Sequence, residues 1–212
     1  MSAGPKPLTL AAPKGRLLQR LAPRLHACGF TQESLSDRDR RLIRESADQR
    51  LRLFLLKPDD VPTYVEHGAA DVGIVGRDVL LERAADVLVP VDLKLGVCKL
   101  AVAAQNPEAL RPPAGRALRV ATKYPNIARA HFAARGEDVE VIFLGGSVEL
   151  GPLANLADCI VDIVETGETL RSNGLFVYET VCEVSAVLIV NRVSMKLHRD
   201  AINALLATLS AG

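Results

Sequence analysis

The amino-acid sequence predicts an α/β protein with mostly parallel sheets. Along its 212 residues, short runs of aliphatic and β-branched residues alternate with segments whose apolar residues recur at helical spacing. This alternation is typical of strand–helix–strand units, which build parallel sheets. Several strand-like runs also end in a polar turn that leads into a helix, and open α/β sheets bind their ligands at that edge. The pattern leaves open whether the strands form one sheet or two.

Each expected strand is a short apolar run bounded by glycine, proline or polar residues. In chain order the expected strands are Leu8–Ala12, Leu51–Leu56, Val72–Val75, Val87–Val91, Leu100–Ala104, Leu118–Ala121, Val139–Leu144, Cys159–Val164 and Val187–Val190.

The expected helices are marked by apolar spacing and by their end residues. Leu17–Cys28 has helical spacing and stops at Gly29, and Val61–His67 stops at Gly68. Asp78 is the expected N-cap of the next helix. The proline-rich residues 106–115 are expected to form a surface loop. In the second half, one helix is expected to have Pro125 in its first turn and Gly136 just past its end, and a short helix is expected to end near Gly174. The last helix has apolar residues at i, i+3, i+4 and i+7, namely Ile202, Leu205, Leu206 and Leu209.

Composition excludes several classes of protein. Hydrophobic residues make up 49% and charged residues 24%, which is ordinary for a globular chain and wrong for a disordered one. With 26 basic and 25 acidic residues, bulk binding to nucleic acid or to an anionic membrane has no compositional support. No apolar run reaches the roughly 18 residues that span a bilayer. The N-terminus lacks the apolar stretch of a signal peptide, so we expect a cytoplasmic protein.

The nucleophilic and metal-binding residue types are scattered. The cysteines lack CxxC spacing and lie among apolar neighbours, which predicts reduced, buried thiols. The histidines are equally scattered, which argues against a zinc site. The sequence has no Ser-His-Asp or Cys-His arrangement and no Walker A lysine motif. The cysteines are Cys28, Cys98, Cys159 and Cys182, and the histidines are His26, His67, His131 and His198.

The clearest candidate site is Asp162–Leu170, which reads Asp-Ile-Val-Glu-Thr-Gly-Glu-Thr-Leu. A buried strand with one acid inside it and a second at its end leads into Thr-Gly-x-Thr and a helix. Free N–H groups, hydroxyl groups and the helix dipole at such a turn suit a phosphate. Asp162 and Glu165 could bind ribose hydroxyls or Mg²⁺, as a phosphorylated sugar requires. The alternative is an ordinary turn with a threonine N-cap, and the paired acids favour the site.

A second candidate site is basic. Lys14, Gly15 and Arg16 follow the first strand and open the first helix. Two cations at a helix N-terminus oppose the macrodipole unless an anion binds there, so this turn predicts a phosphate or pyrophosphate contact. A solvated pair of basic residues remains the alternative.

Further charged residues lie near other strand ends. Lys57 could reach a polyphosphate, and Asp78 is either a helix cap or a ribose ligand. In a run that includes Arg40, Arg41 and Arg44, Arg41 is the member expected to point into a cleft. The alternative for this run is a solvated surface.

The turn Thr122–Asn126 offers Tyr124 to a base and Lys123 to a phosphate; the alternative is a proline-started helix with a surface lysine. Gly145–Glu149 adds a flexible turn with a hydroxyl and an acid. Polar turns at the carboxyl ends of several strands belong to one face of an open sheet. Their clustering is a stronger indication of a site than any single motif.

Taken in order, these motifs resemble the ATP phosphoribosyltransferase family, the first enzyme of histidine biosynthesis, in its short form. The resemblance runs from about Leu8 to the last helix. The main markers are Gly146–Glu149, Ala157–Asp158 and Asp162–Leu170. Supporting matches lie at Pro13–Leu17, Asp60–Val65, Ala70–Gly76 with Asp78, and Ala121–Asn126.

Three positions depart from the family pattern. Asn155 replaces a glycine, and asparagine tolerates a left-handed conformation. Lys57 stands where the family commonly has an arginine; the lysine keeps the charge but lacks the bidentate fork of a guanidinium. Glu168 occupies a variable position in the phosphate turn and is expected to point outward.

The resemblance implies a bilobal fold similar to type II periplasmic binding proteins, with two sheets flanked by helices. Residues 1–94 and 181–212 would form lobe I, and residues 95–180 would form lobe II with the phosphate turn. The implied reaction transfers the phosphoribosyl group of phosphoribosyl pyrophosphate to N1 of ATP and releases pyrophosphate. Such a pentosyltransferase needs no covalent residue, and its transition state should resemble an oxocarbenium ion.

The resemblance also implies roles for individual residues. Lys14, Arg16, Arg41 and Lys57 neutralise the leaving group and the triphosphate. The 5′-phosphate and ribose bind at Asp162, Glu165, Thr166, Gly167, Glu168, Thr169 and Leu170, with Asp162 and Glu165 as contacts for substrate-borne Mg²⁺. ATP contacts fall to Gly15, Asp78, Lys123 and Tyr124.

The implied cofactor is Mg²⁺, and the implied partner is a regulatory subunit similar to histidyl-tRNA synthetase in a hetero-octamer. A homodimer of catalytic chains is also expected. The sequence ends after one more helix, which fits the catalytic part alone. The alternative function is a non-catalytic sensor of small anions or nucleotides. Phosphoribosyltransferases of the common fold place two adjacent acids before their Thr-Gly turn, whereas Ile163 and Val164 separate the acids here.

Overall fold

A computed structural model describes residues 6–36 and 39–211, which form two compact units. Unit 1 runs up to Gly96 and resumes at Ser185, and unit 2 is the continuous segment Val97–Val184. The sequence-based boundaries fell after residues 94 and 180. The second boundary lies later in the structure because strand β10 stays paired with β6 until Val184. A division after residue 180 would cut this strand.

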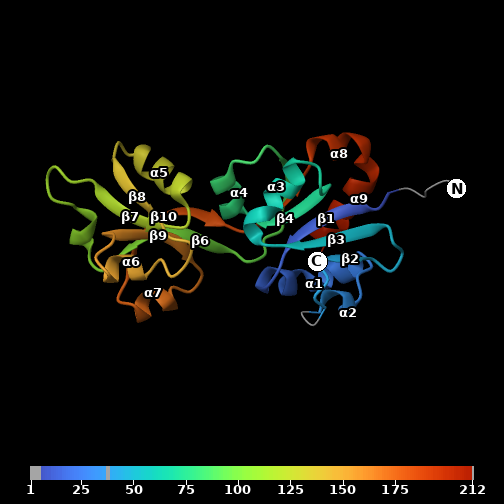
Figure 1. Ribbon diagram of the computed structural model, residues 1–212, viewed down its shortest axis with the longest axis horizontal. Helices are drawn as coiled ribbons and strands as arrows, with labels where there is room; N and C mark the ends of the chain where they lie inside the picture. The colour runs from blue at the N-terminus through green and yellow to red at the C-terminus, as the bar shows by residue number, and fades with distance from the viewer. Residues whose placement is uncertain (1–5, 37–38, 212) are drawn as a thin grey trace. The chain divides into compact units, whose positions relative to one another are not determined.

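Unit 1 is built on a six-stranded mixed sheet (Figure 1). β1 lies parallel to β3 and β4, whereas the pairings β2–β3, β4–β11 and β11–β5 are antiparallel. The prediction of mostly parallel sheets is therefore wrong. In spatial order the strands are β2 (Ile43–Glu45), β3 (Leu51–Leu56), β1 (Leu8–Pro13), β4 (Val72–Gly76), β11 (Ala186–Val190) and β5 (Leu88–Asp92).

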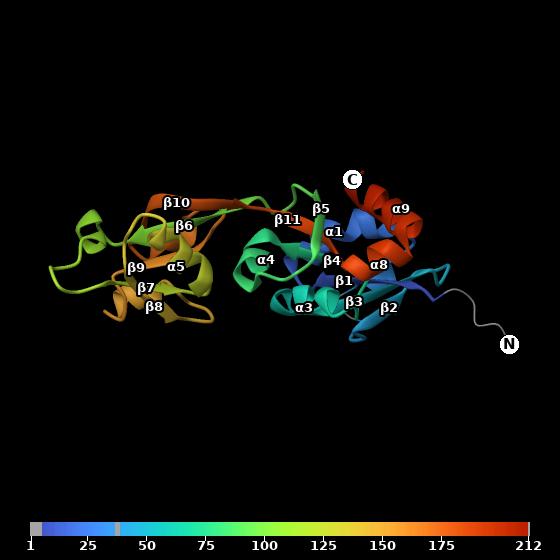
Figure 2. The same ribbon diagram turned by 90° about the horizontal axis from the view of Figure 1, so that it is seen from above.

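Two apolar layers cover the two faces of this sheet. Leu residues of α1 and α9 pack on one face, and α3 and α4 pack on the other (Figure 2). The amphipathic spacing of the last helix, with Ile202, Leu205, Leu206 and Leu209 all buried, explains why it docks there. The helices are α1 (Arg16–Ala27), α2 (Gln32–Leu35), η1 (Pro58–Asp60), α3 (Val61–Glu66), α4 (Arg77–Arg83), α8 (Arg192–Leu197) and α9 (Arg199–Ser210).

Unit 2 has a five-stranded mixed sheet of its own. β7 lies parallel to β8 and β9, while β6 pairs antiparallel with β9 and β10. α5 packs on one face, and α6 and α7 lie over the other (Figure 1). The elements are β6 (Cys98–Ala104), η2 (Pro107–Leu110), β7 (Leu118–Thr122), α5 (Pro125–Ala133), β8 (Val139–Phe143), α6 (Leu150–Leu153), β9 (Cys159–Val164), α7 (Glu168–Ser172) and β10 (Phe176–Val184).

Several local expectations are corrected by the structure. α4 begins at Arg77 with Gly76 as its N-cap, so Asp78 lies in the first turn and is not the cap. Of the thiols, only Cys159 is fully buried, and the other three are half-buried. Burial raises the pKa of Cys159 to about 12 and that of Cys28 to about 11. No helix among the described residues is long and apolar enough to cross a membrane.

Candidate functional site

Three parallel strands of unit 1 end side by side. β1 lies between β3 and β4, so the turns that follow these strands share one edge of the sheet. Lys14, directly after β1, donates its backbone N–H to the carbonyl of Leu56 at 3.0 Å, next to Lys57. The exposed side chains of Lys14 and Lys57 therefore start from the same edge.

The first helix also begins at this edge. Gly15 is its N-cap with φ of 89°, a conformation that side chains disfavour. The first turn contains no acid, and no described side chain caps it. Its N–H groups and the exposed Arg16 are therefore suited to an anion. The anion-binding roles of Gly15 and Arg16 stay predictions.

A cavity of about 270 Å³, here called the arginine pocket, lies beside this turn. It brings together two of the predicted cations, Lys14 and Arg41, whereas Arg16 and Lys57 do not line it. Four cations and a single carboxylate line it, so the pocket is suited to an anion carrying several charges. Its lining residues are Lys14, Leu18, Asp39, Arg40, Arg41, Arg44 and Leu55.

Arg41 is held by an acid two residues before it in the sequence. Its Nε and Nη2 donate to the two carboxylate oxygens of Asp39 at 2.9 to 3.1 Å, and its backbone N–H donates to Oδ1 at 2.9 Å. These bonds lower the pKa of Asp39 to about 2. The Arg41 side chain remains 76% exposed, so it lies at the pocket rim and does not point into a cleft as expected.

Arg40 is a further cation of this pocket, although the sequence analysis singled out Arg41. It lines the same pocket, is exposed, and has no ion pair with any described residue. Its guanidinium is therefore available to an anion, unlike that of Arg41. The signal in the sequence was Asp39, because an acid beside a pair of arginines occupies only one of them.

Asp78 lies inside the turn after β4. Its side chain is 6% exposed, and a Cβ placed on Gly76 would come within 2.2 Å of its Oδ1. The carboxylate therefore folds back over the glycine at the helix start. A ribose contact would require this buried carboxylate to be reached, so the ATP role of Asp78 stays a prediction.

Unit 2 repeats the arrangement at the carboxyl ends of its parallel strands. β7 lies between β8 and β9, so the turns after these three strands share an edge. The turn after β9 passes through Gly167, which has φ of 72° and is the N-cap of α7. The backbone here adopts a conformation that only glycine takes without strain, as the phosphate-turn prediction requires.

A cavity of about 330 Å³, here called the turn pocket, lies against this segment. Glu165, Thr166, Gly167 and Leu170 line it, as the phosphate prediction requires. Glu168 and Thr169 are exposed and do not line it. The remaining lining residues are Lys99, Val164, Arg171, Leu175, Phe176 and Val177.

The turn after β7 places one of its two predicted ligands in the core. Tyr124 is 5% exposed and packs under α5, so its ring offers little surface for a base to stack on. Lys123 is half-exposed, with its Nζ 6.0 Å from the centre of that ring. The Thr122 hydroxyl accepts from the Tyr124 backbone N–H at 2.8 Å and fixes the turn. Of the two, only Lys123 is placed to meet a substrate.

Comparison with known proteins decides the family. The HisG family model, described as ATP phosphoribosyltransferase, matches residues 57–211. The ATP phosphoribosyltransferase of Sorangium cellulosum is 54% identical over 206 residues, which cover 97% of this chain and 96% of that protein. That of Streptococcus thermophilus is 48% identical over 195 residues, covering 92% and 89%. This chain belongs to the ATP phosphoribosyltransferase family.

A solved structure supports the same assignment. The ATP phosphoribosyltransferase (HisG:HisZ) complex from Thermotoga maritima matches with a TM-score of 0.82 at 35% identity, covering 95% of each chain. The bilobal, periplasmic-binding-protein-like fold of type II, expected from the sequence, is thereby confirmed, with two mixed sheets flanked by helices.

Some residues that mark the ATP phosphoribosyltransferase family in this sequence stabilise the fold. Asp158 accepts from Arg116 at 2.7 Å and from Arg119 at 2.9 Å, and these bonds lower its pKa although burial alone would raise it. Asp71 accepts from the Thr9 backbone at 2.8 Å. Asn155 has φ of 57°, which confirms the expected left-handed conformation.

Lys99 and Arg171 also line the turn pocket, and the sequence pattern did not single them out. In the turn pocket of this family member, Lys99 of β6 lies opposite Val164 of β9. Arg171 lies one helical turn after Gly167, and its Nη1 would be 3.3 Å from a Cβ there. The spacing of Gly167 and Arg171 was a readable signal, whereas Lys99 is brought in only by strand pairing.

The acids of this turn, Asp162 and Glu165, are the candidate metal ligands. Asp162 is half-buried and accepts from the Ile163 backbone at 2.8 Å, while Glu165 is exposed. Among the described residues, no three His, Cys, Asp or Glu side chains gather to hold an ion. Mg²⁺ commonly binds through one or two carboxylates and substrate phosphates, so the donor set fits an ion that arrives with a substrate.

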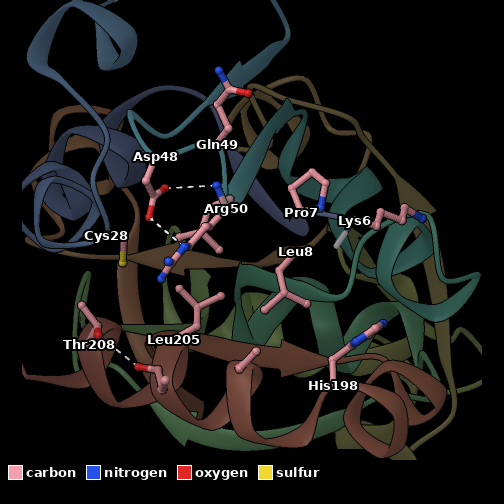
Figure 3. A pocket seen from close by; sticks show the side chains of 13 residues that line it. Lys6, Pro7, Leu8, Cys28, Asp48, Gln49, Arg50, His198, Leu205 and Thr208 are labelled. Carbon is pink, nitrogen blue, oxygen red and sulfur yellow. Dashed lines mark hydrogen bonds and ion pairs between the residues drawn. The ribbon is translucent and has the colours of Figure 1, made fainter. Parts of the chain in front are cut away.

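A larger cavity of about 900 Å³ lies elsewhere in unit 1 (Figure 3). Leu8 of β1 and Leu205 of α9 point into it, and Lys6, Arg50 and His198 lie around it. It contains none of the predicted site residues. Leu8 begins β1, so this cavity is at the opposite end of that strand from Lys14.

Proposed function

We propose that this chain transfers the phosphoribosyl group of phosphoribosyl pyrophosphate to N1 of ATP, the first step of histidine biosynthesis. The nitrogen attacks the anomeric carbon, the bond from that carbon to the pyrophosphate oxygen breaks, and N1-phosphoribosyl-ATP and pyrophosphate are the products. The proposal rests on family membership. Within the structure, the observation that carries it is the arginine pocket, whose cations suit a pyrophosphate.

The proposal gives separate roles to two groups of side chains. Lys14, Arg40 and Arg41, with Arg16 and Lys57 nearby, neutralise the leaving pyrophosphate and the triphosphate of ATP. Preorganised cations stabilise charge that develops on a leaving group, and they act without a covalent intermediate. The absence of a Ser-His-Asp or Cys-His motif in the sequence agrees with such a mechanism.

The 5′-phosphate binds at the turn after β9. Thr166 and Gly167 line the turn pocket, and Lys99 and Arg171 add positive charge to it. Thr169 follows two residues after Gly167, and its exposed side chain can contact the same ligand. Glu168 points away from the pocket in this assignment. Lys123, Gly15 and Asp78 are the proposed contacts to ATP.

Asp162 and Glu165 contact the ribose and hold Mg²⁺ together with substrate oxygens. The ion supplies charge neutralisation of the pyrophosphate when it is bound. We also propose a cytoplasmic location and assembly with a regulatory subunit, since the related Thermotoga maritima structure is a HisG:HisZ complex. A homodimer of catalytic chains is part of this proposal.

The test is a product assay of the purified chain with ATP, phosphoribosyl pyrophosphate and Mg²⁺, with and without a HisZ-type subunit. Mass spectrometry should detect phosphoribosyl-ATP in at least one condition. The competing hypothesis, a non-catalytic anion or nucleotide sensor, predicts tight binding of both ligands without product in either condition.

A further inference from the structure

Arg44 is a buried cation that the proposed reaction does not use directly. Its side chain is 4% exposed, although its residue belongs to the short edge strand β2. A buried guanidinium is costly unless its N–H groups are satisfied, so its partners indicate its task. All of them precede β2 in the chain, and two of them, Asp39 and Arg41, line the arginine pocket.

The partners of Arg44 are three backbone carbonyls. Nη2 donates to Asp39 at 2.7 Å, Nε donates to Arg41 at 3.3 Å, and Nη1 donates to Ser34 of α2. One planar fork thus joins the α2 helix to the two residues that flank Arg40 in the sequence. Lysine cannot reproduce this geometry, because its ammonium group is a single donor centre.

The carboxylate of Asp39 completes this frame. It is 14% exposed, it holds the Arg41 guanidinium, and its Oδ2 lies 3.8 Å from Nε of Arg44. Arg44 therefore holds the backbone of Asp39 and Arg41, and the Asp39 carboxylate holds the side chain of Arg41. Arg40 is the residue between these two fixed points that keeps an available guanidinium.

We propose that Arg44 is a positioning residue that holds Arg40 and Arg41 in place for a diphosphate or triphosphate anion in the arginine pocket. The inference rests on the proposed function. Preorganised cations bind an anion without first losing backbone freedom, so loosening this segment weakens affinity even when every ligating side chain is still present.

A matched control exists in the same unit. Arg24 of α1 is also buried, and it donates to the carbonyls of Leu209 at 3.0 Å and Leu93 at 3.4 Å. It does not line the arginine pocket. Arg24→Met therefore reports what the loss of a buried guanidinium does to stability alone.

The experiment titrates inorganic pyrophosphate into the wild-type chain, Arg44→Met, Arg24→Met and Arg40→Met by calorimetry, with thermal unfolding and steady-state kinetics of each. We expect both buried-arginine variants to lower Tm. Arg44→Met and Arg40→Met should weaken pyrophosphate binding about tenfold or more, whereas Arg24→Met should stay within about twofold of wild type. The KM for phosphoribosyl pyrophosphate should likewise rise in Arg44→Met and Arg40→Met and stay near the wild-type value in Arg24→Met.

Arg44→Lys keeps the charge and serves if Arg44→Met does not fold. It should still bind pyrophosphate several-fold more weakly than wild type, since the fork is lost. Wild-type affinity in Arg44→Met or Arg44→Lys, or an equal loss in Arg24→Met, would overturn the inference. If the wild-type chain forms no phosphoribosyl-ATP, the proposed function fails instead, and the pyrophosphate titrations still report on Arg44.

Discussion

At the scale of single residues, two adjacent arginines differ in what they can still bind. Asp39 already occupies the Nε and Nη2 atoms of Arg41, whereas Arg40 has no ion pair with a described residue. Arg40→Met should lower kcat/KM about 10- to 100-fold, the loss of a hydrogen bond to a charged group, and Arg41→Met should cost several-fold less.

Steady-state kinetics of both variants measures this difference. Arg50→Met is the control, because Arg50 is exposed beside the cavity of Figure 3, and its kcat/KM should stay within about twofold of wild type. Equal losses in the two adjacent variants, or a larger loss in Arg41→Met, would contradict the division of roles.

The hydroxyl of Thr122 is the second residue-scale feature. It is fully buried, donates to the Val161 carbonyl and accepts from the Tyr124 N–H. Thr122→Val keeps the shape and removes both hydrogen bonds of the hydroxyl, so it should lower the free energy of unfolding by about 1–3 kcal/mol. Urea unfolding should show Thr122→Ser much closer to wild type. A valine variant as stable as wild type would show that the hydroxyl does not hold this turn.

At the scale of elements, short apolar strands were predicted well, and a strand of mixed polarity was not. Leu51–Leu56 and Cys159–Val164 were predicted with the bounds they have in the structure, since each is an apolar run with a single charged residue in it. β10 was missed because its sequence, FVYETVCEV, mixes acids with apolar residues. It is a strand through its pairing with β6, a long-range contact that local pattern does not contain.

The packing of α3 on β4 depends on Gly73. A Cβ at this position would lie 2.7 Å from Val65 Cγ2 and 3.0 Å from atoms of Val61 and Ile189. Gly73→Ala should therefore lower the free energy of unfolding by about 1–3 kcal/mol through overpacking. Chemical denaturation measures the change, with Gly145→Ala as the control because nothing lies within 4 Å of its added methyl group. Similar stability of the two variants would refute this close approach.

At the scale of the whole molecule, local sequence pattern indicates residues at strand ends but not residues that strand pairing brings to the pockets. The cations at strand ends, such as Lys14 and Lys57, follow from local pattern, because a strand end and a helix start can both be read from sequence. Lys99 could not be predicted, since only the β6–β9 pairing brings it to the turn pocket. The sequence analysis offered Tyr124 to a base, whereas the structure buries its ring, because an aromatic residue at a helix start can also pack in the core.

The chain leaves unit 1 after Gly96 and returns at Ser185, and one carboxylate joins these two passages. Asp92 accepts from the Lys94 backbone at 2.9 Å and from the Ser185 hydroxyl at 2.7 Å. Arg77 and Lys94 approach its other oxygen at 3.4 and 3.2 Å. The Lys94 N–H first, and the Ser185 hydroxyl second, lower the pKa of Asp92 to about 2.

This lowered pKa predicts how the stability of the protein depends on pH. A carboxyl whose pKa is about 3.9 in the unfolded chain and lower in the folded state stabilises the fold fully above pH 4 and loses this effect as the pH falls toward 2. Asp92→Asn should therefore cost roughly 1–2 kcal/mol at pH 7 and progressively less below pH 4. Urea unfolding of both proteins from pH 7 to pH 3 measures the difference. Asp86→Asn, at an exposed ion pair with Arg192, should show almost none. A difference between wild type and Asp92→Asn that stays constant down to pH 3 would mean that Asp92 does not join the two passages through its charge.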